Sequence, residues 1–148
     1  SKEAKKRFKL EKIIWAVTKK NPLKAESKTP ISKKIKDCKK IIGMNSFIKV
    51  KFYENIIKSN KTIDLINYLK KNKNIEIFFL MGADNLISFH RWHKSELISQ
   101  KCNIIVFDRH GYKKNSLKSK TFKRLNNKTL TFVEFKKVNI SSSQLRKI

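Results

Sequence analysis

Short apolar runs alternate with amphipathic segments along most of the chain, and this alternation predicts strands and helices in turn. Strand-length apolar runs lie at residues 12–18, 47–52, 75–81, 103–107 and 130–135. Helical segments are predicted at residues 3–10, 30–42, 62–71, 86–89, 95–100 and 118–125, with a last one after residue 141. The clearest helix start is Thr29-Pro30, a hydroxyl N-cap followed by proline at the first helical position, and Gly43 marks the end of that helix.

This order of elements predicts an α/β fold with three layers and a mostly parallel sheet, in a single domain over residues 1–148. In such folds ligands bind where the carboxyl ends of the parallel strands meet. Polar segments follow the predicted strands directly, namely Asn21-Pro22-Leu23-Lys24, Gly82-Ala83-Asp84-Asn85, Asp108-Arg109 and Ser141-Ser142-Ser143. We therefore expect these segments to gather at one edge of the sheet.

The net charge of +26 admits two interpretations. A field of that strength attracts polyanions such as nucleic acid. Yet among the 37 basic residues only Arg7, Arg91, Arg109, Arg124 and Arg146 are arginine, the residue whose bidentate fork serves nucleic-acid recognition. Abundant Lys, Asn and Ile together indicate the compositional bias of an AT-rich genome. A solvated lysine surface is the simpler interpretation, and nucleic-acid binding stays an alternative.

Apolar run lengths and cysteine usage bear on location. No apolar run approaches the ~20 residues of a membrane-spanning helix, and the amino terminus has no signal-peptide pattern. Cys38 and Cys102 are too few and too far apart for a disulfide framework, which favours free thiols in a reducing compartment. We expect a cytoplasmic protein with no membrane partner.

The most informative segment runs from Phe78 to His93. An apolar run ends in Gly82 and Asp84, and an aromatic cluster containing Trp92 follows. Gly82 would let the backbone approach a ligand, and Asp84 would accept hydrogen bonds from sugar hydroxyls. Trp92 would offer a flat face to a planar ring. The alternatives are a helix N-cap for Asp84 and a core or rim position for Trp92.

The residues after position 140 have the chemistry of an anion site. The first turn of a helix presents unsatisfied N–H groups, to which Ser142 and Ser143 add hydroxyls and Arg146 a guanidinium, a set that suits a triphosphate. A serine N-cap with a surface arginine is the alternative, and Lys24 is either a phosphate ligand or a surface lysine. Candidates for zinc ligation match no standard ligand spacing: His90, His93, Cys102 and His110.

Five segments in order along nearly the whole chain resemble motifs of bacterial nicotinate-nucleotide adenylyltransferases. They are Ile14-Trp15-Ala16-Val17-Thr18 with Asn21-Pro22-Leu23-Lys24, Lys61-Thr62-Ile63-Asp64, Met81-Gly82-Ala83-Asp84-Asn85-Leu86 with Phe89-His90-Arg91-Trp92, residues 106–112, and residues 140–146. The third is the most specific, because it nearly equals the family consensus. The resemblance implies a Rossmann-like nucleotidyltransferase fold. It also implies adenylyl transfer from ATP to nicotinate mononucleotide, with Mg²⁺ on the phosphates, giving deamido-NAD and pyrophosphate in NAD biosynthesis.

The resemblance also implies which residues bind each substrate. Trp92 would stack on the pyridine ring, and backbone N–H groups near Thr62 and His93 would hold its carboxylate. The implied mononucleotide site comprises Asn21, Lys24, Thr62, Gly82, Asp84, Trp92 and His93. The implied ATP site comprises Arg109, Ser142, Ser143 and Arg146.

Departures from the family pattern bear on activity. The family's first strand and its G-x-F-D-P-x-H-x-G-H loop, whose histidines bind the ATP phosphates, have no counterpart in these 148 residues, so no catalytic residue is assigned. The resemblance then implies a fragment, a misplaced start or a degraded gene. Lys61 replaces a usual Tyr, and Leu65 a usual Thr, near the pyridine pocket. We expect this chain alone to lose several orders of magnitude in rate, and an inactive remnant stays an alternative.

Overall fold

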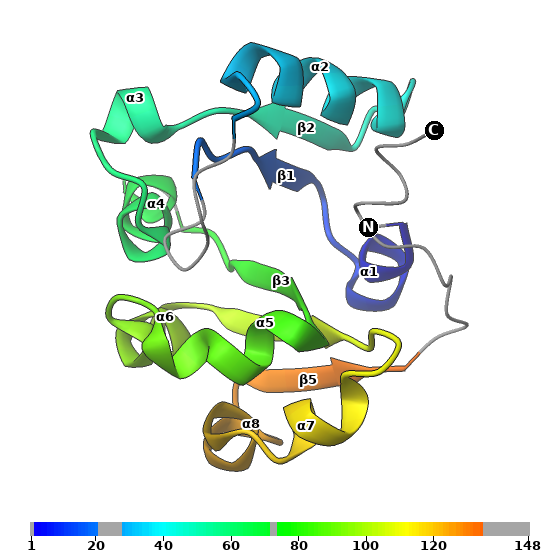
Figure 1. Ribbon diagram of the computed structural model, residues 1–148, viewed down its shortest axis with the longest axis vertical. Helices are drawn as coiled ribbons and strands as arrows, with labels where there is room; N and C mark the ends of the chain where they lie inside the picture. The colour runs from blue at the N-terminus through cyan, green and yellow to red at the C-terminus, as the bar shows by residue number, and fades with distance from the viewer. Residues whose placement is uncertain (1, 21–27, 72–73, 135–148) are drawn as a thin grey trace. The chain divides into compact units, whose positions relative to one another are not determined.

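The computed structural model describes residues 2–20, 28–71 and 74–134, and it contains helices and parallel strands as predicted for an α/β fold (Figure 1). The chain divides into two compact units, residues 1–68 and 69–148, with the boundary inside one helix. Each unit holds its own parallel sheet. Within the described residues, no helix has the length and apolar character to cross a membrane.

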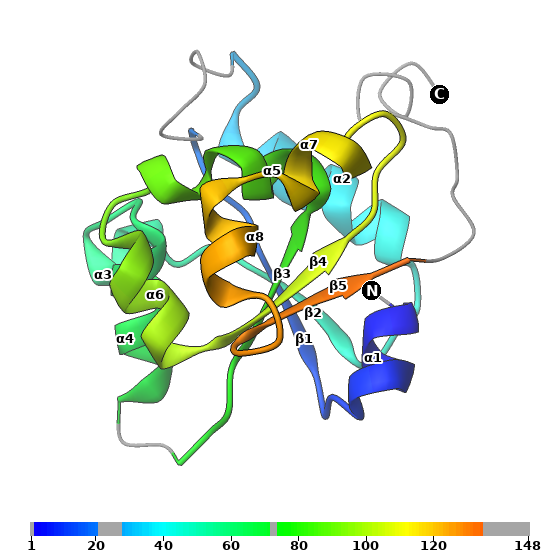
Figure 2. The ribbon, with the colours of Figure 1, turned by 90° about the horizontal axis from the view of Figure 1, so that it is seen from below.

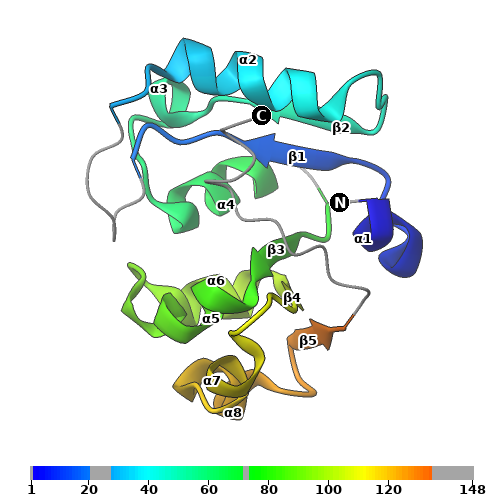
Figure 3. The ribbon, with the colours of Figure 1, turned by 45° about the vertical axis from the view of Figure 1, so that its right-hand side comes forward.

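The first unit is built around a two-stranded parallel sheet. Its elements are α1 (Lys2–Phe8), β1 (Ile13–Ala16), α2 (Ile31–Ile42), β2 (Ile48–Lys51), α3 (Glu54–Ile57) and most of α4 (Thr62–Lys70). Residue Ile13 lies opposite Ile48, and Ala16 lies opposite Lys51. Helix α2 connects the two strands and packs beside β2 (Figure 3). This is the strand–helix–strand order that parallel pairing requires.

Burial in the first unit alternates along β2 but not along β1. On β2, Ile48 is buried and its neighbour Lys49 is exposed, as expected for a strand with one covered face. On β1, Ile13 and Val17 are buried, but Trp15, which lies between them on the same face, is exposed. The predicted helix after Thr29-Pro30 is present but begins at Ile31, so Pro30 rather than Thr29 occupies the N-cap position. Gly43 ends it as predicted, at φ +56°, with its N–H donating to the carbonyl of Lys39 at 3.1 Å.

The second unit is built around a three-stranded parallel sheet in the order β3-β4-β5. Its elements are β3 (Phe78–Gly82), α5 (Ala83–Ser88), a 3₁₀ turn (Phe89–Arg91), α6 (Ser95–Lys101), β4 (Asn103–Phe107), α7 (Lys113–Leu117), α8 (Lys120–Leu125) and β5 (Leu130–Val133). Helix α5 contacts β3 and β4, and α7 and α8 contact α5 (Figure 2).

The core of the second unit lies around the central strand. Ile104, Ile105 and Val106 of β4 are at most 1% exposed, because a strand lies on each side of them and helices cover the sheet. Leu86 and Phe89 are fully buried as well. A near-continuous apolar run is typical of a parallel strand buried on both faces, and the predicted bounds of this strand are confirmed.

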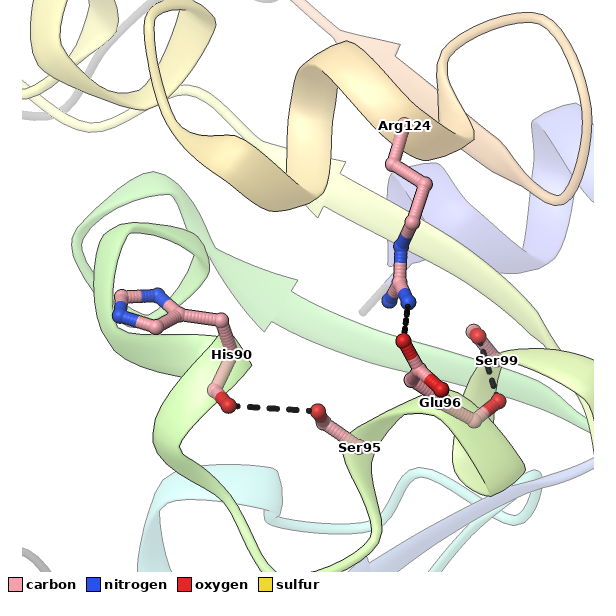
Figure 4. Close-up of polar contacts among 5 residues, drawn as sticks. All are labelled: His90, Ser95, Glu96, Ser99 and Arg124. Carbon is pink, nitrogen blue, oxygen red and sulfur yellow. Dashed lines mark hydrogen bonds and ion pairs between the residues drawn. The ribbon is translucent and has the colours of Figure 1, made fainter.

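Polar contacts tie the outer helices of the second unit to one another. Arg124 of α8 donates from Nη1 to Oε1 of Glu96 on α6 at 2.6 Å (Figure 4). The hydroxyl of Ser95 donates to the carbonyl of His90 at 3.4 Å, and that of Ser99 to the carbonyl of Glu96 at 2.7 Å. Helices α6 and α8 are therefore joined at their surface by an ion pair.

The structure differs from the predicted elements at two short helices and at one strand boundary. The loop predicted between residues 52 and 61 contains the four-residue helix α3, and α7 was not predicted. Both helices are too short to show a repeating apolar pattern. Strand β3 begins at Phe78, three residues later than predicted. The helix predicted after residue 141 lies outside the described residues.

Candidate functional site

The carboxyl ends of β3 and β4 bring two predicted site residues together. The strands pair in register, with Gly82 opposite Phe107. Asp84 follows β3 by two residues, and Arg109 follows β4 by two residues. Nη1 of Arg109 donates to Oδ2 of Asp84 at 2.7 Å, so a carboxylate and a guanidinium meet at the strand ends where ligands bind in parallel sheets.

The two partners of this pair differ in exposure. The side chain of Asp84 is 17% exposed, against 41% for Arg109, so the cation is the more accessible partner. Among the described residues, Oδ1 of Asp84 is buried and has no hydrogen-bond partner. A Cβ at Gly82 would lie 2.6 Å from that oxygen, which explains why glycine precedes the carboxylate here. Gly82 occupies the N-cap position of α5, so Asp84 lies in the first turn of that helix and is not its N-cap.

Trp92 occupies a rim position in an aromatic cluster of the second unit. Its ring centroid lies 5.3 Å from that of Phe89, at 57° between the planes, and 5.9 Å from that of Phe79, at 82°. These tilted and edge-on contacts are those that aromatic quadrupoles favour. The indole is only half-buried, so both interpretations of Trp92, rim aromatic and stacking platform, are compatible with its position. His93 beside it is exposed.

The first unit contains a hollow next to Thr62. Its empty volume is about 320 Å³, part of it open to solvent. It is lined by the end of β1, by α3 and by the start of α4: Ala16, Val17, Thr18, Tyr53, Glu54, Ile57, Ser59, Asn60, Lys61, Thr62 and Leu65. Its walls are mainly apolar, with hydroxyl, amide and ammonium groups among them.

Two long side chains fix the chain just after β1, beside this hollow. The ammonium of Lys34 donates to the carbonyls of Thr18 at 3.1 Å and of Lys19 at 2.6 Å. The N–H of Lys19 donates to both carboxylate oxygens of Glu54, each at 3.3 Å. Sequence reasoning missed Glu54 and Lys34, because α3 was not predicted and Lys34 is one of many lysines. No local sequence pattern separates Lys34 from the other lysines of α2.

The start of α4 has its own polar cap. The hydroxyl of Ser59 donates to Oδ2 of Asp64 at 2.6 Å and accepts from the N–H of Lys61 at 3.1 Å. The carbonyl of Lys61 accepts from the N–H groups of Asp64 and Leu65. These bonds fix the backbone on either side of Thr62.

The two thiols differ in burial. Cys102 is buried and its Sγ donates to the carbonyl of Ile98 at 3.1 Å; burial raises its pKa to about 11. Cys38 on α2 is half-buried, and burial followed by the charge of Asp37 raises its pKa as well. A thiol with a raised pKa is mostly protonated near neutral pH, so neither cysteine has the properties of a nucleophile.

Part of the predicted site falls outside the described residues: Asn21, Lys24, Ser142, Ser143 and Arg146. Of the others, Gly82, Asp84, Trp92, His93 and Arg109 belong to the second unit, and Thr62 belongs to the first. The gathering of all of them at one sheet edge stays a prediction.

Comparison with known proteins agrees with the resemblance found in the sequence. The cytidylyltransferase-like family matches residues 1–148. A probable nicotinate-nucleotide adenylyltransferase of Pelagibacter ubique (strain HTCC1062) is 64% identical over 148 residues, which are 100% of this chain and 82% of that protein. A protein of the same name from Brucella abortus (strain 2308) is 30% identical over 97% of this chain and 82% of its own length. Another, from Agrobacterium fabrum, is 36% identical over 73% of this chain and 58% of its own length.

Proposed function

We propose that this protein transfers the adenylyl group of ATP to nicotinate mononucleotide. The premise is that the chain belongs to the cytidylyltransferase-like family, and within it to the nicotinate-nucleotide adenylyltransferases. A phosphate oxygen of the mononucleotide attacks the α-phosphorus of ATP. The bond to the β,γ-phosphates breaks, and pyrophosphate leaves. The product, deamido-NAD, places the reaction in NAD biosynthesis, and a cytoplasmic location belongs to the same proposal.

The observation that carries this proposal is the meeting of Asp84 and Arg109 at adjacent strand ends. A guanidinium matches the geometry of phosphate oxygens, and a carboxylate accepts hydrogen bonds from sugar hydroxyls. The two substrates supply both groups, ATP its phosphates and the mononucleotide its ribose hydroxyls. The pair therefore has the chemistry that nucleotide substrates require, at the sheet edge where such substrates bind.

The reaction needs no covalent intermediate on the protein. Both reactants are anionic, so catalysis consists of positioning them in line and neutralising charge on the transferring phosphoryl group. We propose that Arg109 contributes to this neutralisation, and that Asp84 orients the mononucleotide. Mg²⁺ would arrive with ATP, held mainly by phosphate oxygens and water, as is usual for this ion.

The remaining residues have roles proposed from the resemblance. Trp92 would stack on the pyridine ring with its half-buried indole. By the resemblance, backbone N–H groups near Thr62 and His93 would hold the pyridine carboxylate. The residues proposed by resemblance alone are Asn21, Lys24, Ser142, Ser143 and Arg146.

Pyrophosphate release by the full-length protein tests the proposal. ATP with nicotinate mononucleotide should give turnover, and nicotinamide mononucleotide serves as the competing acceptor. Arg109→Met should lower kcat/KM by about a hundredfold, because a phosphate-stabilising contact is lost from the transition state. Arg124→Met removes the same charge from a pair outside the proposed site and should leave kcat/KM near wild type.

Absence of turnover with both acceptors would reject the proposal. The family assignment favours this function over that of a basic nucleic-acid-binding protein. The latter would show tight binding that weakens steeply with salt and no affinity for pyridine nucleotides.

A further inference from the structure

We infer that Arg109 is a positioning residue that couples the two substrates: it holds the carboxylate of Asp84, and the phosphates of a nucleoside triphosphate release that carboxylate for the mononucleotide. The inference rests on the proposed function. It begins from the fact that the two residues assigned to different substrates bind each other, at 2.7 Å.

The first step concerns the two oxygens of Asp84. Oδ2 is engaged by Arg109, and Oδ1 is buried without a hydrogen-bond partner among the described residues. While the pair is closed, the carboxylate offers a sugar hydroxyl no exposed, unengaged oxygen. A mononucleotide that uses Asp84 must therefore open the pair or bind after something else has opened it.

The second step concerns which partner a ligand reaches first. Arg109 is 41% exposed, and its guanidinium carbon lies 5.8 Å from the ring centroid of Tyr112, so it is at the solvent side of the pair. Phosphate oxygens form bidentate, charge-assisted hydrogen bonds with arginine and compete directly with a carboxylate for it. A bound triphosphate thus removes the group that occupies Asp84.

The energetic consequence is positive coupling between the substrates. The cost of opening the pair is borne once, by whichever ligand binds first, so the second ligand binds more tightly. A partly exposed pair is a modest interaction, and we expect each substrate to tighten the other about 3- to 10-fold. The same factor must appear in both directions, because coupling free energies are reciprocal.

Isothermal titration of the full-length protein tests this coupling. Nicotinate mononucleotide is titrated alone and with saturating α,β-methylene-ATP, an analogue that cannot transfer its adenylyl group. Wild type should show the 3- to 10-fold tightening, at about the magnitude expected for such a pair. In Arg109→Met the analogue should no longer change the mononucleotide affinity. Arg124→Met, which breaks the surface pair with Glu96, should keep the wild-type factor (Figure 4).

Three results are decisive against the inference. Wild type that binds both ligands without coupling would overturn it and leave the proposed function standing. Arg109→Met that keeps the wild-type factor would overturn it too, and Arg109→Gln provides the same reading if circular dichroism shows Arg109→Met to be unfolded. Wild type that binds neither ligand would reject the proposed function and the inference with it.

Discussion

The two parallel sheets fix their strand ends in different ways. In the second unit β4 has a neighbour on both sides, and its three central residues are sealed from solvent. In the first unit β1 pairs only with β2 among the described residues, and Trp15 at its centre is 38% exposed. There the end of the strand is held by Lys34 and Glu54 instead. Apolar packing thus fixes the three-stranded sheet of the second unit, whereas long polar side chains fix the strand end in the two-stranded sheet of the first unit.

The largest expected effect comes from truncating the same residue type in each sheet. Ile105→Ala, in β4, should lower the free energy of unfolding by about 2–5 kcal/mol, because it leaves a cavity in a closed core. Ile14→Ala, on the half-buried strand β1, should cost clearly less. Urea unfolding followed by circular dichroism measures both. Equal losses of unfolding free energy in the two variants would contradict the proposal that β4 is more completely buried than β1.

The two thiols extend the comparison to pH. Burial raises the pKa of Cys102 to about 11, so the folded state binds its proton more tightly than the unfolded state. Its contribution is fully present below pH 9 and is lost as pH rises toward 11, so the free energy of unfolding should fall over that range. From pH 8.5 to 10.5 the fall due to this group is at most about 2 kcal/mol.

Cys102→Ala should remove that part of the alkaline slope, measured by chemical unfolding across the pH range. Cys38→Ala is the matched control in the first unit and should change the slope less, because its thiol is half-buried. A slope that Cys102→Ala leaves unchanged would show that other groups cause the alkaline loss.

Glycine substitutions should separate activity from stability. In Gly82→Ala the new Cβ would meet Oδ1 of Asp84 at 2.6 Å, and the carboxylate must move from its place beside Arg109. We expect the full-length protein to lose about tenfold or more in kcat/KM, since small misplacements of binding groups are costly. Because φ at Gly82 is −82°, an alanine there has no backbone strain and stability should change little.

Gly43→Ala, at the end of α2, should show the opposite pattern. Nothing lies within 4 Å of the added Cβ, but φ is +56°. The backbone strain should lower the free energy of unfolding by about 1–3 kcal/mol while kcat/KM stays near wild type. Loss of activity in both variants to the same extent would argue against a role for the position of Asp84.

The smallest effect is expected at the end of β1. Lys34→Met removes two hydrogen bonds to backbone carbonyls and should lower the free energy of unfolding by about 0.5–1 kcal/mol. Lys33→Met removes the same charge from the exposed face of α2 and should be nearly neutral. Thermal unfolding compares them, and hydrogen exchange at the N–H of Lys19 should quicken only in Lys34→Met. Equal stability of the two variants would show that the hydrogen bonds of Lys34 do not contribute and that only the loss of a positive charge on α2 has an effect.

The amino-acid pattern predicted the buried central strand of the second unit best. The strand at residues 103–107 has the predicted bounds, because an uninterrupted apolar run between polar flanks allows few other placements. The short helices α3 and α7 were missed, since four or five residues cannot display helical periodicity. The start of α2 differed by one position, a normal uncertainty where proline begins a helix.

The residues of the candidate site could be predicted from the sequence, but the contacts between them could not. Gly82, Asp84, Trp92 and Arg109 stand out as residue types at strand ends or in an aromatic cluster. The pairing of Asp84 with Arg109 joins positions 25 residues apart, and no local pattern encodes such a contact. Glu54 illustrates the converse, because its partner Lys19 lies 35 residues earlier and neither stands out in sequence.

The hydrogen-bond ladder between β3 and β4 acts as a molecular ruler. Gly82 and Phe107 are the last paired residues, and Asp84 and Arg109 each lie two positions beyond them. The ruler measures distance along the strands, so a change of length at the exposed residues His93 and Lys94, between the two marks, should leave the carboxylate opposite the guanidinium. A single inserted codon between Gly82 and Asp84, by contrast, would shift one mark on the ruler and separate the pair.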